Sequence, residues 1–237
     1  MDKKFLDIRK YISDKEEGFC DYLISMLDAD ARTLLMAISM QTTVYVFSGV
    51  IRNYLLGYKD VRDLDVVIRN IGKIEIPTSI ISRCRITKNS FGGYKLHTGN
   101  LNIDVWDLCK TWGIRKENKS GNAISLIDSA FFNFSSIVFD YRRKKFIYKE
   151  NFLQFMENHT MEVVYRENPN KELCIINSLY YNKKYGFRVG SSLAQWIRDY
   201  YSQDMNFKDT QLRHFGRVLY EEDELRLFYV TCLYKLM

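Results

Sequence analysis

The chain of 237 residues is long enough for one large domain or two small ones, and its 46% hydrophobic content supports a buried core. Its formal net charge of +6 is compatible with a polyanionic partner, and no apolar run approaches the roughly 18 residues of a membrane helix. The five cysteines form no C-x-x-C pair, so we expect reduced thiols in a cytoplasmic protein rather than zinc or a disulfide framework.

The first part of the chain is expected to form a mixed sheet backed by helices. Apolar residues recur at helical spacing over 19–27 and again over 34–38, and Asp28 or Asp30 is expected to cap the second helix. A strand, a tight turn and a helix over 50–56 follow. The β-rich runs are 44–47, 64–69, 93–97 and 101–108.

The sequence pattern becomes helical near residue 150. We therefore expect a head domain over 1–150 and a helical domain over 151–237. Pro169 suits a first helical turn, and apolar residues after it continue at three- and four-residue steps. Helices are expected over 167–186, from Ser191 onward, and over 221–236.

Three carboxylates are expected to share one face of the sheet. Asp63 and Asp65 are two residues apart in an aliphatic run, so an extended strand points both the same way. Such a pair is costly unless solvent or a cation offsets the repulsion, and hard divalent ions prefer oxygen ligands. Asp104 lies in a later β-rich run, and Asp107, three residues on, faces the opposite way as a surface acid or a turn residue. The alternative is a solvated strand end at which Arg62 forms a salt bridge.

An ordered set of short motifs includes the first two carboxylates. In chain order the motifs are Ser48-Gly49, Arg52-Asn53, Leu55-Leu56-Gly57 and Asp63-Leu64-Asp65. This order resembles the head of the nucleotidyltransferase superfamily, in its branch of tRNA CCA-adding enzymes and bacterial poly(A) polymerases. The resemblance implies an α/β (α+β) fold, with a nucleotidyltransferase-type mixed β-sheet head flanked by helices and a helical neck-like part after it.

The resemblance also implies a reaction, the transfer of an NMP from an NTP to a hydroxyl acceptor with release of pyrophosphate. Asp63 and Asp65 are expected to bridge two Mg²⁺ (or Mn²⁺) ions. Asp104 is expected to complete the metal on the acceptor side and to help deprotonate the acceptor hydroxyl.

Three further residues are expected to contact the triphosphate. Ser48 and Gly49 would bring backbone N–H groups to the β- and γ-phosphates at a helix start, where the helix dipole favours anions. Arg52, one turn into that helix, would reach a phosphate or hold Asp63 or Asp65 in place.

Two other motifs of the family are altered in this chain. Asn133 is the one residue kept from a motif that helps to hold the nucleotide, and Asn168 and Lys171 stand where the family reads the base edge. Lysine is a point donor without the arginine fork, so altered base specificity is expected and CCA completion is not. The alternative function is a catalytically weak relative that binds nucleotide or RNA, such as a toxin/antitoxin-type component.

Two basic clusters with nearby tyrosines make an RNA 3′ end the expected acceptor, ahead of a small alcohol or antibiotic or a protein hydroxyl. The first cluster is Arg142, Arg143, Lys144 and Lys145, at the expected tip of a hairpin between 136–139 and 146–148, and the second is Lys183 and Lys184. Together they are expected to form a track leading to the acids, in which basic groups meet phosphates and tyrosines stack on bases. A solvated loop and a solvated helix end are the alternatives.

Overall fold

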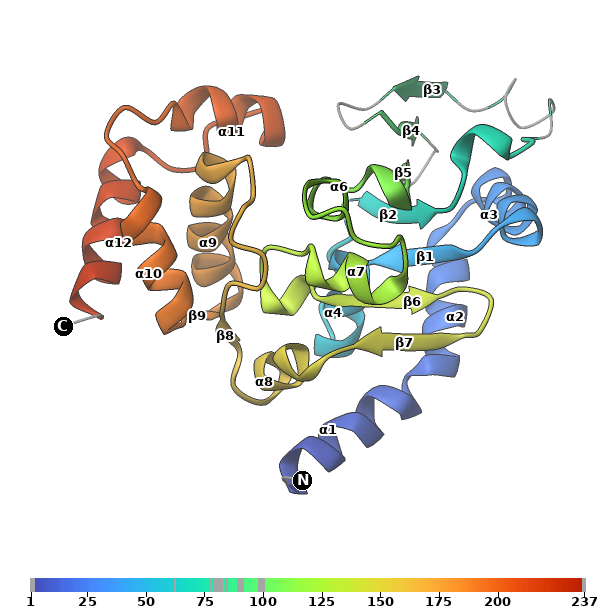
Figure 1. Ribbon diagram of the computed structural model, residues 1–237, viewed down its shortest axis with the longest axis horizontal. Helices are drawn as coiled ribbons and strands as arrows, with labels where there is room; N and C mark the ends of the chain where they lie inside the picture. Colours follow the sequence, from blue (N-terminus) through green and yellow to red (C-terminus); the bar gives the residue numbers. More distant parts are fainter. Residues whose placement is uncertain are drawn as a thin grey trace. The chain divides into compact units, whose positions relative to one another are not determined.

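The computed structural model describes residues 3–235 except 62, 77, 79–82, 84, 89–91 and 98–100. The described residues therefore leave out Arg62, Cys84 and the turn that connects the third and fourth expected strands. The chain divides into two compact units (Figure 1). Unit 1 comprises Met1–Ala130 and Phe134–Leu153, and unit 2 comprises Phe131–Asn133 and Gln154–Met237. None of the helices in the described part of the chain has the length and apolarity that a membrane crossing needs.

Unit 1 is built on a mixed sheet. Within the described residues it has seven strands in the order β3-β4-β5-β2-β1-β6-β7. β2 and β5 run parallel, and the other neighbouring pairs are antiparallel. The bounds are β1 Val44–Phe47, β2 Asp63–Ile68, β3 Arg85–Lys88, β4 Tyr94–His97, β5 Asn102–Asp107, β6 Ile137–Asp140 and β7 Lys145–Tyr148. The expected strands and the expected hairpin are confirmed, with ends shifted by about a residue, and β3 is an addition.

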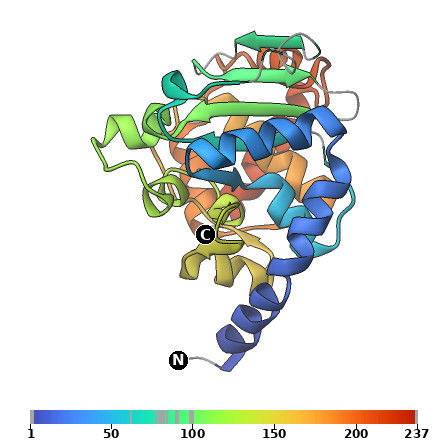
Figure 2. The same cartoon turned by 90° about the vertical axis from the view of Figure 1, so that its right-hand side faces the viewer.

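Helices cover both faces of this sheet. Their bounds are α1 Lys3–Asp14, α2 Glu16–Met26, α3 Ala29–Gln41, α4 Gly49–Leu56, α6 Trp112–Lys116 and α7 Ala123–Asp128. α3 lies across one face (Figure 2), where its apolar residues pack on Leu64, Val66, Ile103 and Val105. On the other face α7 buries Val67 and Val138. Alternation along β2 puts Asp65 and Asp63 on the same face as Val67.

Local signals explain where the helices begin and end. Asp28 caps α3, since its Oδ1 accepts a hydrogen bond from the Ala31 N–H at 2.8 Å. The other expected cap, Asp30, instead forms an ion pair with Arg83 at 2.9 Å. Gly57 ends α4 in the left-handed conformation at φ 75°, which glycine adopts without a steric penalty. Of the two capping candidates, the structure therefore selects Asp28.

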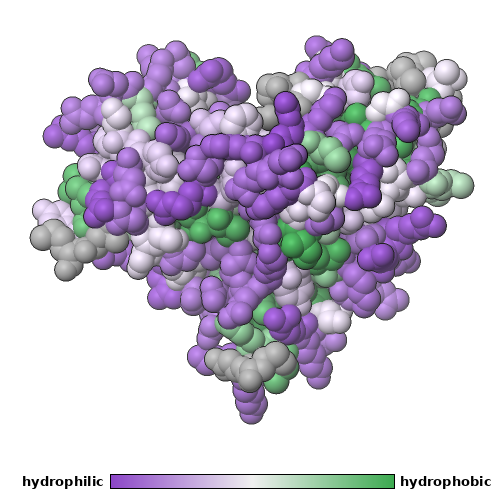
Figure 3. All heavy atoms as spheres, viewed as in Figure 1, coloured by the Kyte–Doolittle hydropathy of each residue, from purple (hydrophilic) through white to green (hydrophobic). Residues whose placement is uncertain are grey.

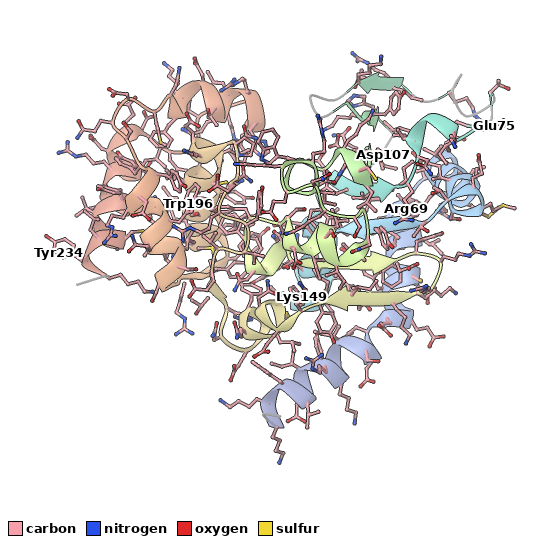
Figure 4. The ribbon with its side chains drawn as sticks, in the orientation of Figure 1. Arg69, Glu75, Asp107, Lys149, Trp196 and Tyr234 are labelled. Atoms are coloured by element: carbon pink, nitrogen blue, oxygen red, sulfur yellow. The ribbon has the colours of Figure 1, made fainter. Side chains whose placement is uncertain are left out.

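Unit 2 is mainly helical. Its elements are β8 Thr160–Met161, α9 Lys171–Tyr185, β9 Arg188–Val189, α10 Ser191–Tyr200, α11 Phe207–Phe215 and α12 Glu222–Tyr234, and α8 Glu150–Asn158 spans the division between the units. Trp196 is fully buried in α10 (Figure 4), its ring 4.6 Å from that of Phe131 and its Nε1 donating to the Arg166 carbonyl. The helices expected from Ser191 onward and over 221–236 are confirmed, except that Leu236 is outside the described residues.

The helix expected over 167–186 is shorter than predicted. α9 begins at Lys171, because the Oδ1 of Asn168 accepts the N–H of Asn170 and turns the chain before the helix starts. Its end at Tyr185 agrees with the prediction, and Gly186 follows at φ 68°.

Candidate active site

The register of the central strands brings the predicted carboxylates together. β2 and β5 are parallel and in register, with Asp65 opposite Asp104 and Asp63 opposite Asn102. Residues opposite each other in a ladder point to the same face, so Asp63, Asp65 and Asp104 share one face, as strand parity predicted. Their neighbours Leu64 and Ile103 are buried on the other face.

A lysine that the sequence reasoning missed lies among these acids. Lys95 on β4 is the register partner of Asp104. Its Nζ lies 3.0 Å from Asp104 Oδ2 and 4.0 Å from Asp63 Oδ1. The site thus contains a cation supplied by the chain itself. Among the described residues, no group of three or more His, Cys, Asp or Glu side chains is arranged to hold a metal ion.

Close backbone packing holds the start of β4, the strand that carries Lys95, against β5. Gly93, just before β4, runs so close to β5 that a Cβ there would overlap the Val105 carbonyl oxygen. The polar face continues past Lys95, because Asn102 Oδ1 lies 2.9 Å from Nδ1 of His97, whose Nε2 is 3.3 Å from Thr87 Oγ1. A polar row across four strands could not be read from the sequence, since β3 and β4 gave no sign of their order in the sheet.

The predicted tight turn adjoins the acids. Phe47, the last residue of β1, is the register partner of Asp65, and Ser48 follows it directly. Ser48 has φ 58° and ψ −99°, a conformation that glycine adopts readily and serine does not. Its N–H donates to the Ile137 carbonyl at 3.1 Å in this structure, and contact between Ser48 and a phosphate stays a prediction.

Gly49 remains a suitable contact for an anion. It is the first residue of α4, and the N–H groups of a first helical turn have no acceptor within the helix. A Cβ built on Gly49 would meet no atom within 4 Å. The space beside its Cα is therefore open, and the helix dipole adds a partial positive charge at this end of α4.

Arg52 is held inside unit 1. It is 4% exposed, its Nε and one terminal nitrogen donate to Asn53 Oδ1 at 3.0 and 2.8 Å, and its guanidinium lies 5.1 Å from the Phe134 ring centroid. Asn53 in turn donates to the Asp60 carbonyl, so the Arg52-Asn53 motif ties α4 to the loop before β2.

Asp107 has a structural role, as one of its two predicted alternatives required. Its two carboxylate oxygens accept the N–H groups of Ile71 and Cys109, each at 2.9 Å, and it is 8% exposed. It therefore fixes the turn after β5 and faces away from the carboxylate site.

Three further residues predicted to bind the nucleotide all belong to unit 2. Asn133 is buried and joins two backbone groups, donating to the Thr160 carbonyl and accepting the Glu162 N–H. Asn168 forms the turn before α9, and the Nζ of Lys171 lies 4.1 Å from the Tyr200 ring centroid. Each side chain is thus oriented by its own unit.

The basic tip does not lead to the acids. The turn after β6 begins at Tyr141, whose N–H donates to the carbonyl of Val44. Val44 is the first residue of β1, whereas Phe47, beside the acids, is the last. The tip and the start of β2 therefore lie at opposite ends of the sheet (Figure 1), and the expected track between them is wrong. In addition, Lys145 forms an ion pair with Glu16, and Arg143 forms one with Asp140.

The second basic cluster is partly engaged within unit 2. Lys183 forms an ion pair with Glu224 on α12, and Lys184 Nζ donates to the hydroxyl oxygen of Tyr180 at 2.9 Å. The pKa of the Glu224 carboxyl lies below its ordinary value because Lys183 donates a hydrogen bond to it. On the face shown in Figure 3 most of the surface is hydrophilic, and hydrophobic residues appear in separate patches.

Comparison with known proteins gives a fold but no sequence match. No protein-family model matches the chain, and no curated protein matches it either. A CCA-adding enzyme in complex with CTP has a TM-score of 0.61 at 14% identity, over 89% of this chain and 53% of that one. A tRNA nucleotidyltransferase complexed with a primer tRNA and an incoming ATP analog has a TM-score of 0.54 at 17% identity, over 70% and 48%. The chain has the nucleotidyltransferase fold.

The Thermotoga maritima CCA-adding enzyme complexed with tRNA shares this nucleotidyltransferase fold, with a TM-score of 0.51 at 16% identity over 82% of this chain and 53% of that one. The chain spans about half the length of the solved structures that it matches. The resemblance read from the motifs is confirmed at the level of the fold.

Proposed function

We propose that the protein is a metal-dependent nucleotidyltransferase that moves an NMP from an NTP to a hydroxyl acceptor and releases pyrophosphate. One observation carries the proposal. The register pairs Phe47–Asp65 and Asp65–Asp104 join the start of α4 and the acids on adjacent strands. Nucleotidyl transfer needs this combination, an anion-binding amide beside carboxylates that can hold cations.

We propose that three acids take up Mg²⁺ or Mn²⁺, although their side chains are not arranged around an ion in the part of the chain that the structure describes. Asp63, Asp65 and Asp104 offer hard carboxylate oxygens on one face, and the Lys95 ammonium stands between two of them as a cation. These three acids are the proposed metal ligands, and a bound divalent ion would offset triphosphate charge and favour ionisation of the acceptor hydroxyl. Asp104 would bind the metal ion on the side of the acceptor hydroxyl.

The nucleotide is proposed to bind along the start of α4. The Gly49 N–H would donate to a phosphate oxygen, favoured by the helix dipole and by the open space beside the Gly49 Cα. Arg52 would keep α4 in place through Asn53 and, as proposed from the motif, supply positive charge toward the phosphates. Asn168 and Lys171 remain proposed nucleotide contacts that set the choice of base. Asn133, proposed from the motif to help hold the nucleotide, would act by fixing the backbone at Thr160 and Glu162.

An RNA 3′ end is the proposed acceptor. Solved structures with the same fold include complexes with a primer tRNA and with tRNA. The net charge of +6 and exposed Arg142 and Lys184 favour a polyanion. Because Asn168 and Lys171 differ from the family's base readers, we propose that the enzyme does not add the ordered sequence CCA.

Labelling of RNA tests this function. The protein is incubated with each α-³²P-labelled NTP, Mg²⁺ and total RNA, alongside Asp65→Asn and the matched control Asp21→Asn, an exposed acid on α2. The wild type and Asp21→Asn should label RNA, and Asp65→Asn should not. Binding of NTP and metal without labelled product would instead support the catalytically weak relative, and label on a protein or small molecule would change the acceptor.

A further inference from the structure

Lys95 occupies a position that a metal ion would need. Its ammonium contacts carboxylates from two strands, 3.0 Å from an oxygen of Asp104 and 4.0 Å from one of Asp63. The side chains of Asp63, Asp104 and Lys95 are 16%, 18% and 31% exposed, so solvent screens these charges less than it would on an open surface. This ion pair is therefore an integral part of the carboxylate site.

We propose that Lys95 competes with the divalent metal for the carboxylates. The Lys95 ammonium must leave the space between Asp63 and Asp104 before a metal ion can enter. The inference rests on the proposed function, and it concerns the site's resting state and its metal affinity. The lysine ammonium is carried on a flexible four-carbon stem, so it can swing out of this space by side-chain rotation.

Charge and size make the two cations exclusive. A divalent ion binds carboxylate oxygens at about 2.0–2.6 Å, closer than the ammonium does, and needs the oxygen lone pairs that Lys95 now uses. An ammonium left in place would also repel the ion across a partly buried site. Conversely, without metal or ammonium the carboxylates would repel one another. Lys95 thus stabilises the metal-free protein and weakens metal binding.

The sheet provides a matched control for Lys95. Lys88 is exposed at the end of β3 and pairs with Tyr94, whereas Lys95 pairs with Thr87. Strand alternation therefore puts Lys88 on the opposite face from the carboxylates. Replacing either lysine by methionine removes one positive charge from the same part of the sheet, but only Lys95→Met removes it from the acids.

The test measures Mn²⁺ binding to the nucleotide-free, full-length protein by electron paramagnetic resonance of free Mn²⁺. Lys95→Met should bind Mn²⁺ at least about tenfold more tightly than wild type, because an opposing charge at contact distance is gone. Lys88→Met should change the affinity by less than about threefold. Adding Asp104→Asn to Lys95→Met should abolish the gain, which assigns the ion to this site.

Thermal unfolding supplies a second readout. Without metal, Lys95→Met should melt at a lower temperature than wild type, and saturating Mn²⁺ should raise its melting temperature by more than it raises that of wild type. Unchanged or weaker Mn²⁺ binding by a folded Lys95→Met protein would overturn the inference, and the proposed function would stand if RNA were still labelled. Tighter binding without any nucleotide transfer by wild type would uphold the inference and remove the proposed function.

Discussion

The substitution Gly49→Ala should raise the stability of the fold and weaken the binding of nucleotide. In Gly49→Ala the new methyl group meets no atom within 4 Å, and Gly49 lies at the first position of α4 with no positive φ. Replacing glycine by alanine in a helix lowers the conformational entropy of the unfolded chain. The free energy of unfolding should therefore rise by about 0.5 kcal/mol, which corresponds to roughly 1–2 °C in melting temperature. The fold should therefore be unharmed.

The same methyl group should block the nucleotide. A phosphate oxygen bonded to the Gly49 N–H would approach to about 2.9 Å, and the methyl group would occupy part of that approach. A hydrogen bond to a charged group is worth about 1.5–3 kcal/mol, so NTP affinity should fall by roughly tenfold or more. Isothermal titration with NTP and Mg²⁺, alongside melting curves, measures both effects.

Gly18→Ala is the control for this prediction. A Cβ on Gly18 would lie 2.7 Å from the Tyr54 hydroxyl, which donates to the Lys15 carbonyl. This variant should lose stability and keep its affinity for nucleotide per folded molecule. If Gly49→Ala binds NTP as tightly as wild type, the triphosphate does not rest on the start of α4. If Gly49→Ala is destabilised, the space over Gly49 is not open.

Three other changes test the structure around the site. Ser48→Gly should raise the free energy of unfolding, measured in urea, by about 1 kcal/mol. The relief of about 1–3 kcal/mol of backbone strain exceeds the cost of the added entropy of the unfolded chain. Ser191→Gly, at a helical residue of α10, should instead lower the free energy of unfolding. Asp107→Ala should cost about 2–4 kcal/mol in the same assay, since two N–H groups lose their acceptor, and a loss near zero would show that water replaces the carboxylate. Burial raises the pKa of Cys232 from 9.0 to about 11, so its contribution to stability is complete below pH 9 and is lost as the pH rises to 11. Cys232→Ala should flatten that alkaline loss of unfolding free energy, and an unchanged pH profile would assign the loss to other groups.

The central strands could be predicted from the sequence because their chemistry is local. Alternation of acids and aliphatics fixes the face of Asp63 and Asp65, and parity separates Asp104 from Asp107 without knowledge of the sheet. The glycine-like backbone of Ser48 also agrees with the motif, in which this residue stands at a glycine position. Here local geometry and family pattern give the same answer.

Long-range neighbours could not be predicted in this way. The contact of Lys95 with Asp104 depends on β4 lying beside β5, an order that no local pattern contains. Basic residues and nearby tyrosines predict a track from the basic tip to the acids, but the direction of β6 carries the tip to the other end of the sheet. Likewise, the start of α9 depends on an Asn168 side chain that competes with the helix for a backbone N–H.

Parallel reactions with α-³²P- and γ-³²P-labelled NTP test the central claim most directly. Nucleotidyl transfer at Asp63, Asp65 and Asp104 predicts that the α-label joins the acceptor and the γ-label leaves as pyrophosphate. Both products should disappear in Asp104→Asn and persist in the control Asp21→Asn. Transfer of the γ-label to an acceptor, or product formation undiminished in Asp104→Asn, would contradict the account.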